Sequence, residues 1–354
     1  MSKRPVKSKQ PPSGGAGRQR PAFASLLAAA IDRRRTLLSA STTDAVRLFG
    51  GEADGLDGVY VDRYGPGCVL ILYQGRVPGD FPVMRAARDA LELTADLGVR
   101  AVYLKPFARD RSSLGGQMPA VLTDPTPAVG DRLDEFFLIT EHGCRLEVRL
   151  YDGYSTGLFL DQRENRRFLA QRVAARVKRG EEARVLNTFA YTGAFSVHCA
   201  LAGAATTTVD ISARYLDWAK RNFTHNGVDP AAHRFAKMDT FEFFRYAKRK
   251  QLAYDLVILD PPSFAAANKK RGIPAWSSTE HYARLVYEAS QLVAPGGVIF
   301  ASTNTADLCR PGRLEREIEQ GLGHRPQYIP LPPIPEDFAA ERERFAAKMV
   351  VVEE

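Results

Sequence analysis

Carboxylates follow three neighbouring strands that the sequence predicts in the C-terminal half of the chain. The run "ATTTVD" ends in Asp210, Asp239 comes shortly after "HRFAK", and "YDLVILD" ends in Asp260. Parallel strands end at one rim of their sheet, and such sheets bind ligands at that rim. A single aspartate in this position is usually the N-cap of the next helix. Three in series favour a ligand-binding site instead.

The turn after the preceding strand, "RVLNTF", indicates which kind of ligand this would be. The stretch "NTFAYTGAFS", residues 187–196, contains one glycine, Gly193, where a helix should begin. A Gly-x-Gly-x-x-Gly fingerprint is absent, and a turn with so little glycine does not closely wrap a pyrophosphate. Asp210 is well placed to accept hydrogen bonds from ribose hydroxyls. The pattern disfavours NAD and favours a ligand with a ribose and an adenine but no pyrophosphate, such as S-adenosylmethionine.

The stretch "LVILDPPSF", residues 256–264, joins an apolar run to an acid and two prolines. Proline has no N–H group and a fixed φ, and it pushes the residue before it toward an extended conformation. Asp260-Pro261-Pro262 is therefore predicted to be a stiff, extended lip. On these nine residues alone, the simpler interpretation of a strand that ends in a proline turn is favoured.

Strands and helices alternate from about Val185 onward, and the strands are continuous apolar runs. This pattern predicts an open, mostly parallel sheet that is covered on both faces. The predicted helices span 193–203, 212–226, 240–250, 279–293 and 311–321, and the last two strands lie near 326–330 and 347–353. Before this region, residues 44–135 show short β-type runs with Gly-Asp turns and a helix at 81–96, which indicates a small α+β domain.

The length, composition and net charge of the chain limit the class of protein to which it can belong. A chain of 354 residues with 45% hydrophobic and 25% charged residues suggests a soluble protein of two domains, and no apolar run approaches the length of a membrane span. The net charge is +8, and residues 1–21 are expected to be a disordered basic tail that attracts phosphate backbones or only aids solubility. Four cysteines without a CxxC pair argue against a metal site and suit the cytoplasm.

Taken together, these motifs resemble a known family. The stretch "NTFAYTGAFSVHCALAGAATTTVDISARYLDWAKRNFTHNG", followed by "DLVILDPPSF", is similar to class I methyltransferases that modify 23S ribosomal RNA, of the RlmI and RlmK types. "VRLFGGEADGLDGVYVDRYG" resembles their small domain, and "EDFAAERERFAAKMVVV" their final strands. The resemblance covers roughly residues 40–354. It implies a seven-stranded Rossmann-like methyltransferase domain at 136–354, preceded by a helix and a small α+β domain at 22–135.

The resemblance also implies which residues bind S-adenosylmethionine. Residues 154–169, "YSTGLFLDQRENRRFL", would close over the cofactor. Asp210 would hold the ribose, and Asp239 would face the adenine amine. The other implied cofactor residues are Asn187, Phe189, Ala190, Tyr191 and Gly193 in the first cofactor loop, Phe159, Asp161, Gln162 and Arg163 on the other side of the cofactor, and Ile211, Thr240 and Asp260. Arg163 is expected at the methionine carboxylate, which a guanidinium matches bidentately. The alternative is that Arg163, Arg166 and Arg167 form a charged helix face.

A second set of residues would hold the target base: Asp260, Pro261, Pro262 and Phe264. The lip would present a carboxylate and free carbonyls, all of them acceptors, to the amino edge of the base. Phe264 would stack on the face of a base that has been swung out of the RNA. Lys269, Lys270 and Arg271 follow closely, and they could hold flanking phosphates or form a solvated loop.

Two departures from the family bear on the reaction. The forty residues before the resemblance are too few for the RNA-binding domain usual in RlmI-like proteins, so RNA affinity is expected from the small domain and the basic tail. Cytosine-C5 methylation needs a thiolate that attacks ring carbon 6. Here "FASTNTADL" has Thr303 and Asn304 where that cysteine should be, and Cys309, further on, is expected to be structural.

The sequence therefore predicts methyl transfer to a guanine nitrogen of ribosomal RNA without a covalent intermediate. Three alternatives stay open: a cytosine-C5 enzyme with an unrecognised cysteine, a catalytically silent RNA-binding assembly factor, and a methyltransferase of proteins or small molecules. No metal and no membrane contact are expected, and an oligomer is neither predicted nor excluded.

Overall fold

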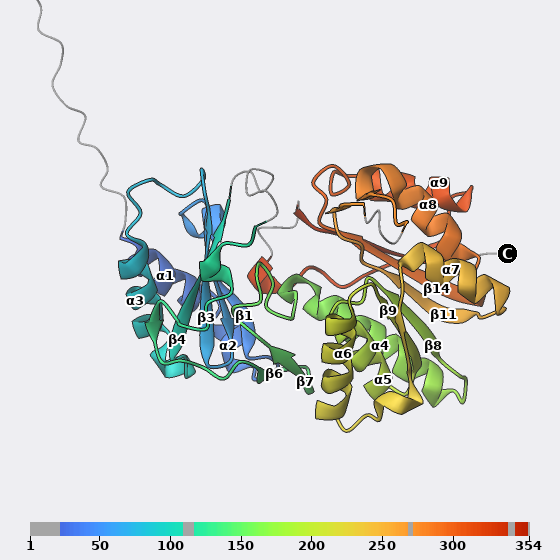
Figure 1. The fold of residues 1–354 in the computed structure, drawn as a ribbon, viewed down its shortest axis with the longest axis horizontal. Coiled ribbons are helices and arrows are strands. Elements are labelled where there is room, and N and C mark those ends of the chain that lie inside the picture. The colour runs from blue at the N-terminus through green and yellow to red at the C-terminus, as the bar shows by residue number, and fades with distance from the viewer. Residues whose placement is uncertain (1–21, 109–116, 268–271, 339–343, 353–354) are drawn as a thin grey trace, which may run out of the picture.

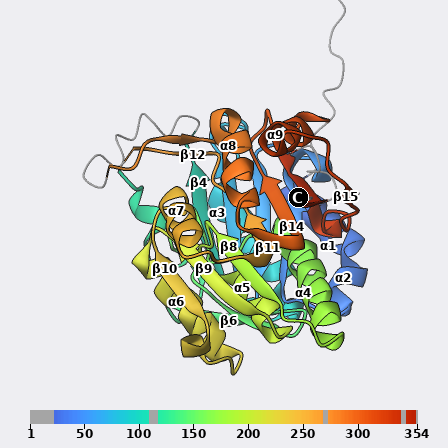
Figure 2. The same ribbon diagram turned by 90° about the vertical axis from the view of Figure 1, so that its right-hand side faces the viewer.

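The computed structural model describes residues 22–108, 117–267, 272–338 and 344–352, which form two main sheets (Figures 1 and 2). The predicted tail at 1–21 and the three cations Lys269, Lys270 and Arg271 lie outside the described residues. In the part that is described, no helix is both long and apolar enough to cross a membrane.

The first sheet has five strands and forms the small α+β part of the chain, on the left in Figure 1. Its strands in spatial order are β1 (Ala45–Gly50), β2 (Val59–Tyr64), β3 (Gly67–Tyr73), β4 (Ala101–Phe107) and β5 (Val129–Gly130). The helices of this part are α1 (Phe23–Arg33), α2 (Arg35–Ser39) and α3 (Val83–Leu93). Leu27 of α1 and Ala87 of α3 pack with Phe49 and Leu70 of the sheet in one apolar core.

The second sheet has seven strands in the order β10-β9-β8-β11-β14-β16-β15. Their bounds are β8 (Arg184–Thr188), β9 (Ala205–Asp210), β10 (Arg234–Lys237), β11 (Tyr254–Leu259), β14 (Val293–Thr303), β15 (Tyr328–Ile329) and β16 (Ala346–Val351). The first five strands in spatial order are parallel, and β16 is antiparallel to both of its neighbours. The predicted seven-stranded, mostly parallel sheet is confirmed.

Helices cover both faces of this sheet, as Figure 2 shows. One face carries α4 (Arg163–Lys178), α5 (Ala194–Leu201) and α6 (Ala213–His225), and the other carries α7 (Thr240–Arg249), α8 (Ser278–Ser290) and α9 (Arg313–Leu322). Successive residues of β11 supply both cores: Leu256 and Ile258 join the core of α4 and α5, and Val257 and Leu259 join the core of α7, α8 and α9. This burial on both faces explains why the strands read as continuous apolar runs.

A hairpin links the two sheets. Its strands are β6 (Phe137–Glu141) and β7 (Cys144–Val148). Tyr103 of the small sheet, Ile139 and Leu146 of the hairpin, and Val197 and Phe223 of α5 and α6 belong to one buried apolar cluster. This core contains residues from both sides of the predicted domain boundary between residues 135 and 136, so it does not mark a division there. The boundary stays a prediction.

Candidate active site

The two central strands of the large sheet set the place of the candidate site. From β8 the chain moves to β9 and β10 on one side, and it later returns to β11 on the other side of β8. The loops after β8 and β11 therefore flank the point where the strand order reverses, which is where open α/β sheets bind ligands. One loop contains Phe189, Tyr191 and Gly193, and the other contains Asp260 and leads directly to Phe264.

The loop after β8 has an unusual backbone. Phe189 and Tyr191 each have φ of 52°, and Gly193 has φ of 73°. Bulky residues rarely adopt positive φ, and they keep it only where the surrounding structure fixes it. The Tyr191 N–H donates to Oδ2 of Asp210 at 2.8 Å, and the Tyr191 hydroxyl accepts from the Gly157 N–H at 2.8 Å. The loop is thus held from both sides.

Asp210 is the centre of this part of the site. Its Oδ2 accepts from Tyr191, and its Oδ1 accepts from the Ser212 N–H at 2.8 Å. Burial raises the pKa of Asp210 above its ordinary value, and the two backbone hydrogen bonds partly offset this. Each carboxylate oxygen keeps a second lone pair. Asp210 can therefore accept further hydrogen bonds from hydroxyl groups.

Two other predicted cofactor residues have structural partners. Asn187 is buried, and its Nδ2 donates to Oγ of Ser196 at 3.0 Å, which ties β8 to α5. Asp239 is the N-cap of α7, as the simpler interpretation held: its Oδ1 accepts from the N–H groups of Phe241 and Glu242. Both cap bonds use one oxygen, so a role of Asp239 at the adenine stays a prediction.

The predicted closing segment lies beside this loop. Phe159 is 50% exposed, and its ring centroid lies 5.4 Å from that of Tyr191. Asp161 and Gln162 form a short 3-10 turn with Leu160 before α4 begins. Gln162 is buried, and its Nε2 donates to Oγ of Ser302 at 3.1 Å.

Arg163 does not face a ligand. Its side chain is 1% exposed, its Nη2 pairs with Oδ1 of Asp337 at 2.5 Å, and its Nη1 donates to the Ala45 carbonyl at 3.2 Å. A guanidinium committed to these groups cannot also bind the methionine carboxylate. The structure therefore argues against that expected role. Arg166 is also buried, paired with Glu141, so of the three arginines only Arg167, whose side chain is 50% exposed, suits a charged helix face.

Hydrogen bonds from Trp276 and Ser278 fix the lip after β11. The Pro262 carbonyl accepts from Nε1 of Trp276 at 2.7 Å and from Oγ of Ser278 at 2.9 Å. Both of its lone pairs are therefore used, so the expectation that this carbonyl faces a base as a free acceptor is wrong. Oγ of Ser263 donates to Oδ1 of Asn304 at 2.8 Å, which ties the lip to the end of β14.

Asp260 is the acceptor that the lip does present. Its Oδ1 accepts from Oγ of Ser302 at 2.6 Å, and Ser302 in turn accepts from Gln162. Burial raises the pKa of Asp260, and the bonds from Ser302 and Gln162 work against that rise. Phe264 is 66% exposed in the short strand β12 (Phe264–Ala265), which pairs with β13 (Trp276–Ser277).

Sequence reasoning missed two of these supports, Ser302 and Trp276. Ser302 ends the predicted strand "GGVIFAS", where a polar residue in a buried run was the available signal. Trp276 lies in β13, in a stretch for which no element was predicted.

The four cysteines are poor nucleophiles. Burial raises the pKa of Cys68 and Cys199 to about 12 and also raises that of Cys144. Cys309 is half-buried, burial raises its pKa to about 11, and its thiol donates to the Thr303 carbonyl at 3.6 Å. All four are therefore thiols and not thiolates near neutral pH.

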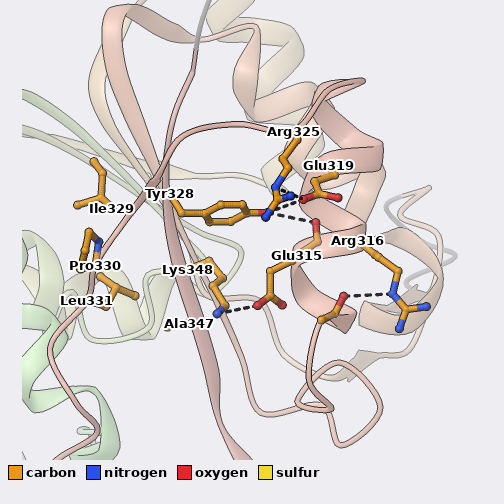
Figure 3. Close-up of a pocket in the computed structure, with 11 residues that line it drawn as sticks. Glu315, Arg316, Glu319, Arg325, Tyr328, Ile329, Pro330, Leu331, Ala347 and Lys348 are labelled. Atoms are coloured by element: carbon orange, nitrogen blue, oxygen red, sulfur yellow. Dashed lines mark hydrogen bonds and ion pairs between the residues drawn. The ribbon is translucent and has the colours of Figure 1, made fainter.

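A separate hollow of about 660 Å³ lies at the outer edge of the large sheet, between α9 and the strands β15 and β16 (Figure 3). None of the predicted site residues lines it. Four of its charged side chains form two ion pairs, Lys348 with Glu315 at 2.7 Å and Arg325 with Glu319 at 3.7 Å. The rim formed by the loops after β8 and β11 therefore stays the candidate site.

The residues at this rim fit S-adenosylmethionine. Asp210 offers acceptors for ribose hydroxyls, and the cap bonds of Asp239 leave its second oxygen unused. Phe159 and Ile211 are apolar side chains that stay 50% and 41% exposed beside the loop after β8. Apolar side chains left exposed next to fixed polar groups are typical of ligand sites. Among the described residues, no group of three or more metal-ligating side chains is placed to bind a metal ion.

Comparisons with known proteins agree with this geometry. The chain is 40% identical over 286 residues to YwbD of Bacillus subtilis, a candidate ribosomal RNA large subunit methyltransferase, which covers 80% of this chain and 67% of that protein. It is 35% identical over 292 residues to a ribosomal RNA large subunit methyltransferase of Deinococcus radiodurans, with coverage of 81% and 67%. The crystal structure of SMU.776, a candidate methyltransferase in complex with SAH, superposes with a TM-score of 0.78 at 30% identity and covers 93% of this chain and 81% of that one.

The match to a protein family spans more than half of the chain. Residues 127–321 match the family described as S-adenosylmethionine-dependent methyltransferase. This range contains β8, β9, β10, β11 and the loops that carry Asp210 and Asp260. The chain belongs to the S-adenosylmethionine-dependent methyltransferase family.

Proposed function

We propose that this enzyme methylates a base of large-subunit ribosomal RNA, by direct transfer to a guanine nitrogen. The named relatives modify ribosomal RNA of the large subunit, and the chain has a net charge of +8, which suits a polyanionic substrate. The observation that carries direct transfer is the placement of the cysteines: three are buried, and the thiol of the fourth, Cys309, donates to the Thr303 carbonyl at 3.6 Å.

The residues of the site suit this reaction. When bound, S-adenosylmethionine supplies a methyl group on a positively charged sulfur. Asp210 accepts from the ribose hydroxyls, and Asp260 accepts from the N1–H and amino group of the guanine when that edge faces the lip. Phe264 stacks on the base, and this contact offsets part of the free energy that is lost when the base is unstacked from the RNA.

Guanine N7 carries a lone pair in the neutral base, so it needs neither a nucleophilic catalyst nor prior loss of a proton. The protein then has to align the nitrogen, the methyl group and the sulfur, and such alignment can contribute about 7–11 kcal/mol. If the N2 amine of guanine were the target instead, it would also face Asp260.

Two experiments test the proposal. In the first, the enzyme is given labelled S-adenosylmethionine and ribosomal RNA from a strain that lacks the gene. The label in the macromolecular product should disappear after ribonuclease treatment, and mass spectrometry should place the label on guanine. Label that survives ribonuclease would mean a protein substrate.

The second experiment tests the role of cysteine. Cys309 is the cysteine to test, because the other three cysteines are buried. Cys309→Ser should retain methyl transfer, since direct transfer needs no thiolate. RNA that contains 5-fluorocytosine should form no covalent adduct with the enzyme. Loss of activity in the folded variant, or a trapped adduct, would instead support cytosine-C5 methylation through Cys309.

A further inference from the structure

The segment Asp152–Leu158 lies against the loop after β8. The Gly157 N–H donates to the Tyr191 hydroxyl at 2.8 Å, and Oγ1 of Thr192 donates to the Gly157 carbonyl at 2.6 Å. Arg214, near the start of α6, binds both oxygens of Asp152 at 2.7 and 3.0 Å. The large sheet and its helices therefore hold both ends of this segment.

The middle of the segment is held by the small sheet. Lys105 of β4 is 1% exposed, and its Nζ donates to the carbonyls of Gly153 and Ser155, each at 2.5 Å. Burial lowers the pKa of Lys105 to about 7, against the raising effect of Asp152. A buried ammonium is unfavourable unless it is paired and hydrogen-bonded. Its three donors, of which two are used here, suit a site with two inward-facing carbonyls.

These contacts form a continuous connection from the small sheet to Asp210. Lys105 binds the carbonyls of residues 153 and 155, Gly157 binds the Tyr191 hydroxyl, and the Tyr191 N–H binds Asp210. Tyr191 has positive φ, so its position depends on its surroundings. Removal of the donor at residue 105 would leave one buried and one partly buried carbonyl without it, and the segment would have to move to regain partners.

We propose that Lys105 is a positioning residue of the cofactor site, through which the small sheet sets the affinity for S-adenosylmethionine. Lys105 acts through residues 153–157 and the loop after β8. This inference rests on the proposed role of Asp210 at the ribose.

Lys105→Met in the full chain tests this inference, since methionine keeps the length of the side chain and loses its donors. We expect affinity for S-adenosylmethionine, measured by calorimetry, to fall about tenfold, and the KM for S-adenosylmethionine to rise while kcat changes less than twofold. Lys220→Met is the matched control, because Lys220 is 46% exposed and, among the described residues, its ion pair is with Asp217 on the surface of the same helix. Its affinity should equal that of the unmodified enzyme.

A double-mutant cycle separates positioning from general stability. Tyr191→Phe removes the hydroxyl that accepts from Gly157 and keeps the ring. If Lys105 acts through this connection, the losses of affinity in Lys105→Met and Tyr191→Phe should not add in the double variant. Additive losses, or a loss of thermal stability with unchanged affinity, would overturn the inference. If Lys105→Met does not fold, Lys105→Gln, which keeps two donors on a shorter side chain, takes its place in the same cycle.

Asp210→Ala separates a failure of the proposed cofactor site from a failure of the proposed role of Lys105. If Asp210→Ala and Lys105→Met both bind S-adenosylmethionine with unchanged affinity, the proposed cofactor site is wrong. If only Asp210→Ala weakens binding, the site stands and Lys105 has a purely structural role.

Discussion

Asp260 is held through one of its two oxygens, and this arrangement determines how activity should depend on pH. The ionised carboxylate accepts hydrogen bonds from a base, and the protonated form accepts fewer. Burial raises the pKa of Asp260 above the ordinary value of an aspartate, so activity should fall as the pH is lowered through this raised pKa. The acid limb of the kcat/KM profile should therefore lie at higher pH than an ordinary aspartate would place it.

Ser302 provides the check on this prediction. Its hydroxyl donates to Oδ1 of Asp260 and lowers the pKa. Ser302→Ala should move the acid limb to higher pH while the affinity for the cofactor stays the same. An acid limb that does not move in the variant would remove Asp260 from the titration that controls activity.

The same shift affects stability with a definite sign. Between the ordinary and the raised pKa of Asp260, the folded state binds more protons than the unfolded state, so the contribution of this group to stability falls as the pH rises. Asp260→Asn, which cannot ionise, should remove this part of the dependence of the unfolding free energy on pH. Asp260 is thus a group that destabilises the fold when it is ionised and ready to act.

Asp210 should contribute directly to cofactor binding. Asp210→Ala removes charge-assisted hydrogen bonds worth roughly 1.5–3 kcal/mol, so affinity by calorimetry should fall about tenfold to hundredfold. Asp210→Asn keeps one oxygen that can accept from the Tyr191 N–H, so the affinity for the cofactor should fall less in this variant. Unchanged affinity in folded Asp210→Ala would show that this carboxylate lies outside the site.

Residue roles were predictable where they depend on the place of a residue after a strand, and less so where they depend on a distant partner. Asp210 and Asp260 fall on the predicted rim because a strand end fixes their position. The partner of Arg163, Asp337, lies 174 positions away, and no local pattern points to it. The carbonyl of Pro262 was misjudged for the same reason, since its donors are on Trp276 and Ser278.

At the scale of elements, the loop after β8 depends on Gly193. A Cβ at this position would lie 2.7 Å from the Cβ of Ala219, so α5 begins in close contact with α6. Gly193→Ala should lower the unfolding free energy by about 1–2 kcal/mol for the left-handed backbone and by a further ~1–3 kcal/mol for the close contact. Denaturant unfolding measures the sum.

Gly180 is the matched control for this prediction. It has φ of 80°, similar to Gly193, but a Cβ there would meet nothing within 4 Å. Gly180→Ala should therefore show the backbone part alone. Equal losses in the two variants would mean that the contact with Ala219 relaxes freely.

Most elements of the large sheet were predictable because strands and helices alternate along the chain, and β11 and β14 each contain a continuous apolar run. The limits of this approach appear in the small part of the chain. The single helix predicted ahead of the small α+β domain is two helices, interrupted at Arg34, which has φ of −97° and ψ of 8°. Arg34 binds Asp54 through both of its terminal nitrogens, at 2.8 and 3.2 Å, and a contact over 20 positions is not visible in a helical pattern.

At the scale of the whole molecule, the connection between β15 and β16 joins the two sheets. Asp337 lies in it and binds Arg163 of α4 and the Arg47 N–H of β1, the latter at 2.9 Å. The neighbouring Phe338 is buried, and the guanidinium of Arg47 lies 4.2 Å from the centroid of its ring. Residues from three distant parts of the chain thus meet at one point, which explains why the sequence predicted the two sheets but not how they are fastened.

The final prediction concerns this junction. Both side chains of the pair between Arg163 and Asp337 are at most 1% exposed, so Asp337→Ala would leave a buried guanidinium without its shortest ion pair, with the longer contact to Glu164 at 3.4 Å remaining. Removal of one partner from such a pair typically lowers the unfolding free energy by about 3–5 kcal/mol. Asp337→Asn keeps an oxygen for the Arg47 N–H, so it should lose less than Asp337→Ala in denaturant unfolding.

Asp217→Ala is the control, because Asp217 pairs with Lys220 on the surface, where such pairs contribute roughly 0–1 kcal/mol. If Asp337→Ala is no less stable than Asp217→Ala, the junction does not hold the sheets together. If it is less stable and still unfolds in one transition, the small sheet and the methyltransferase sheet fold as a single cooperative unit. That result would also give a physical reason why Lys105, a residue of the small sheet, can act on the cofactor site.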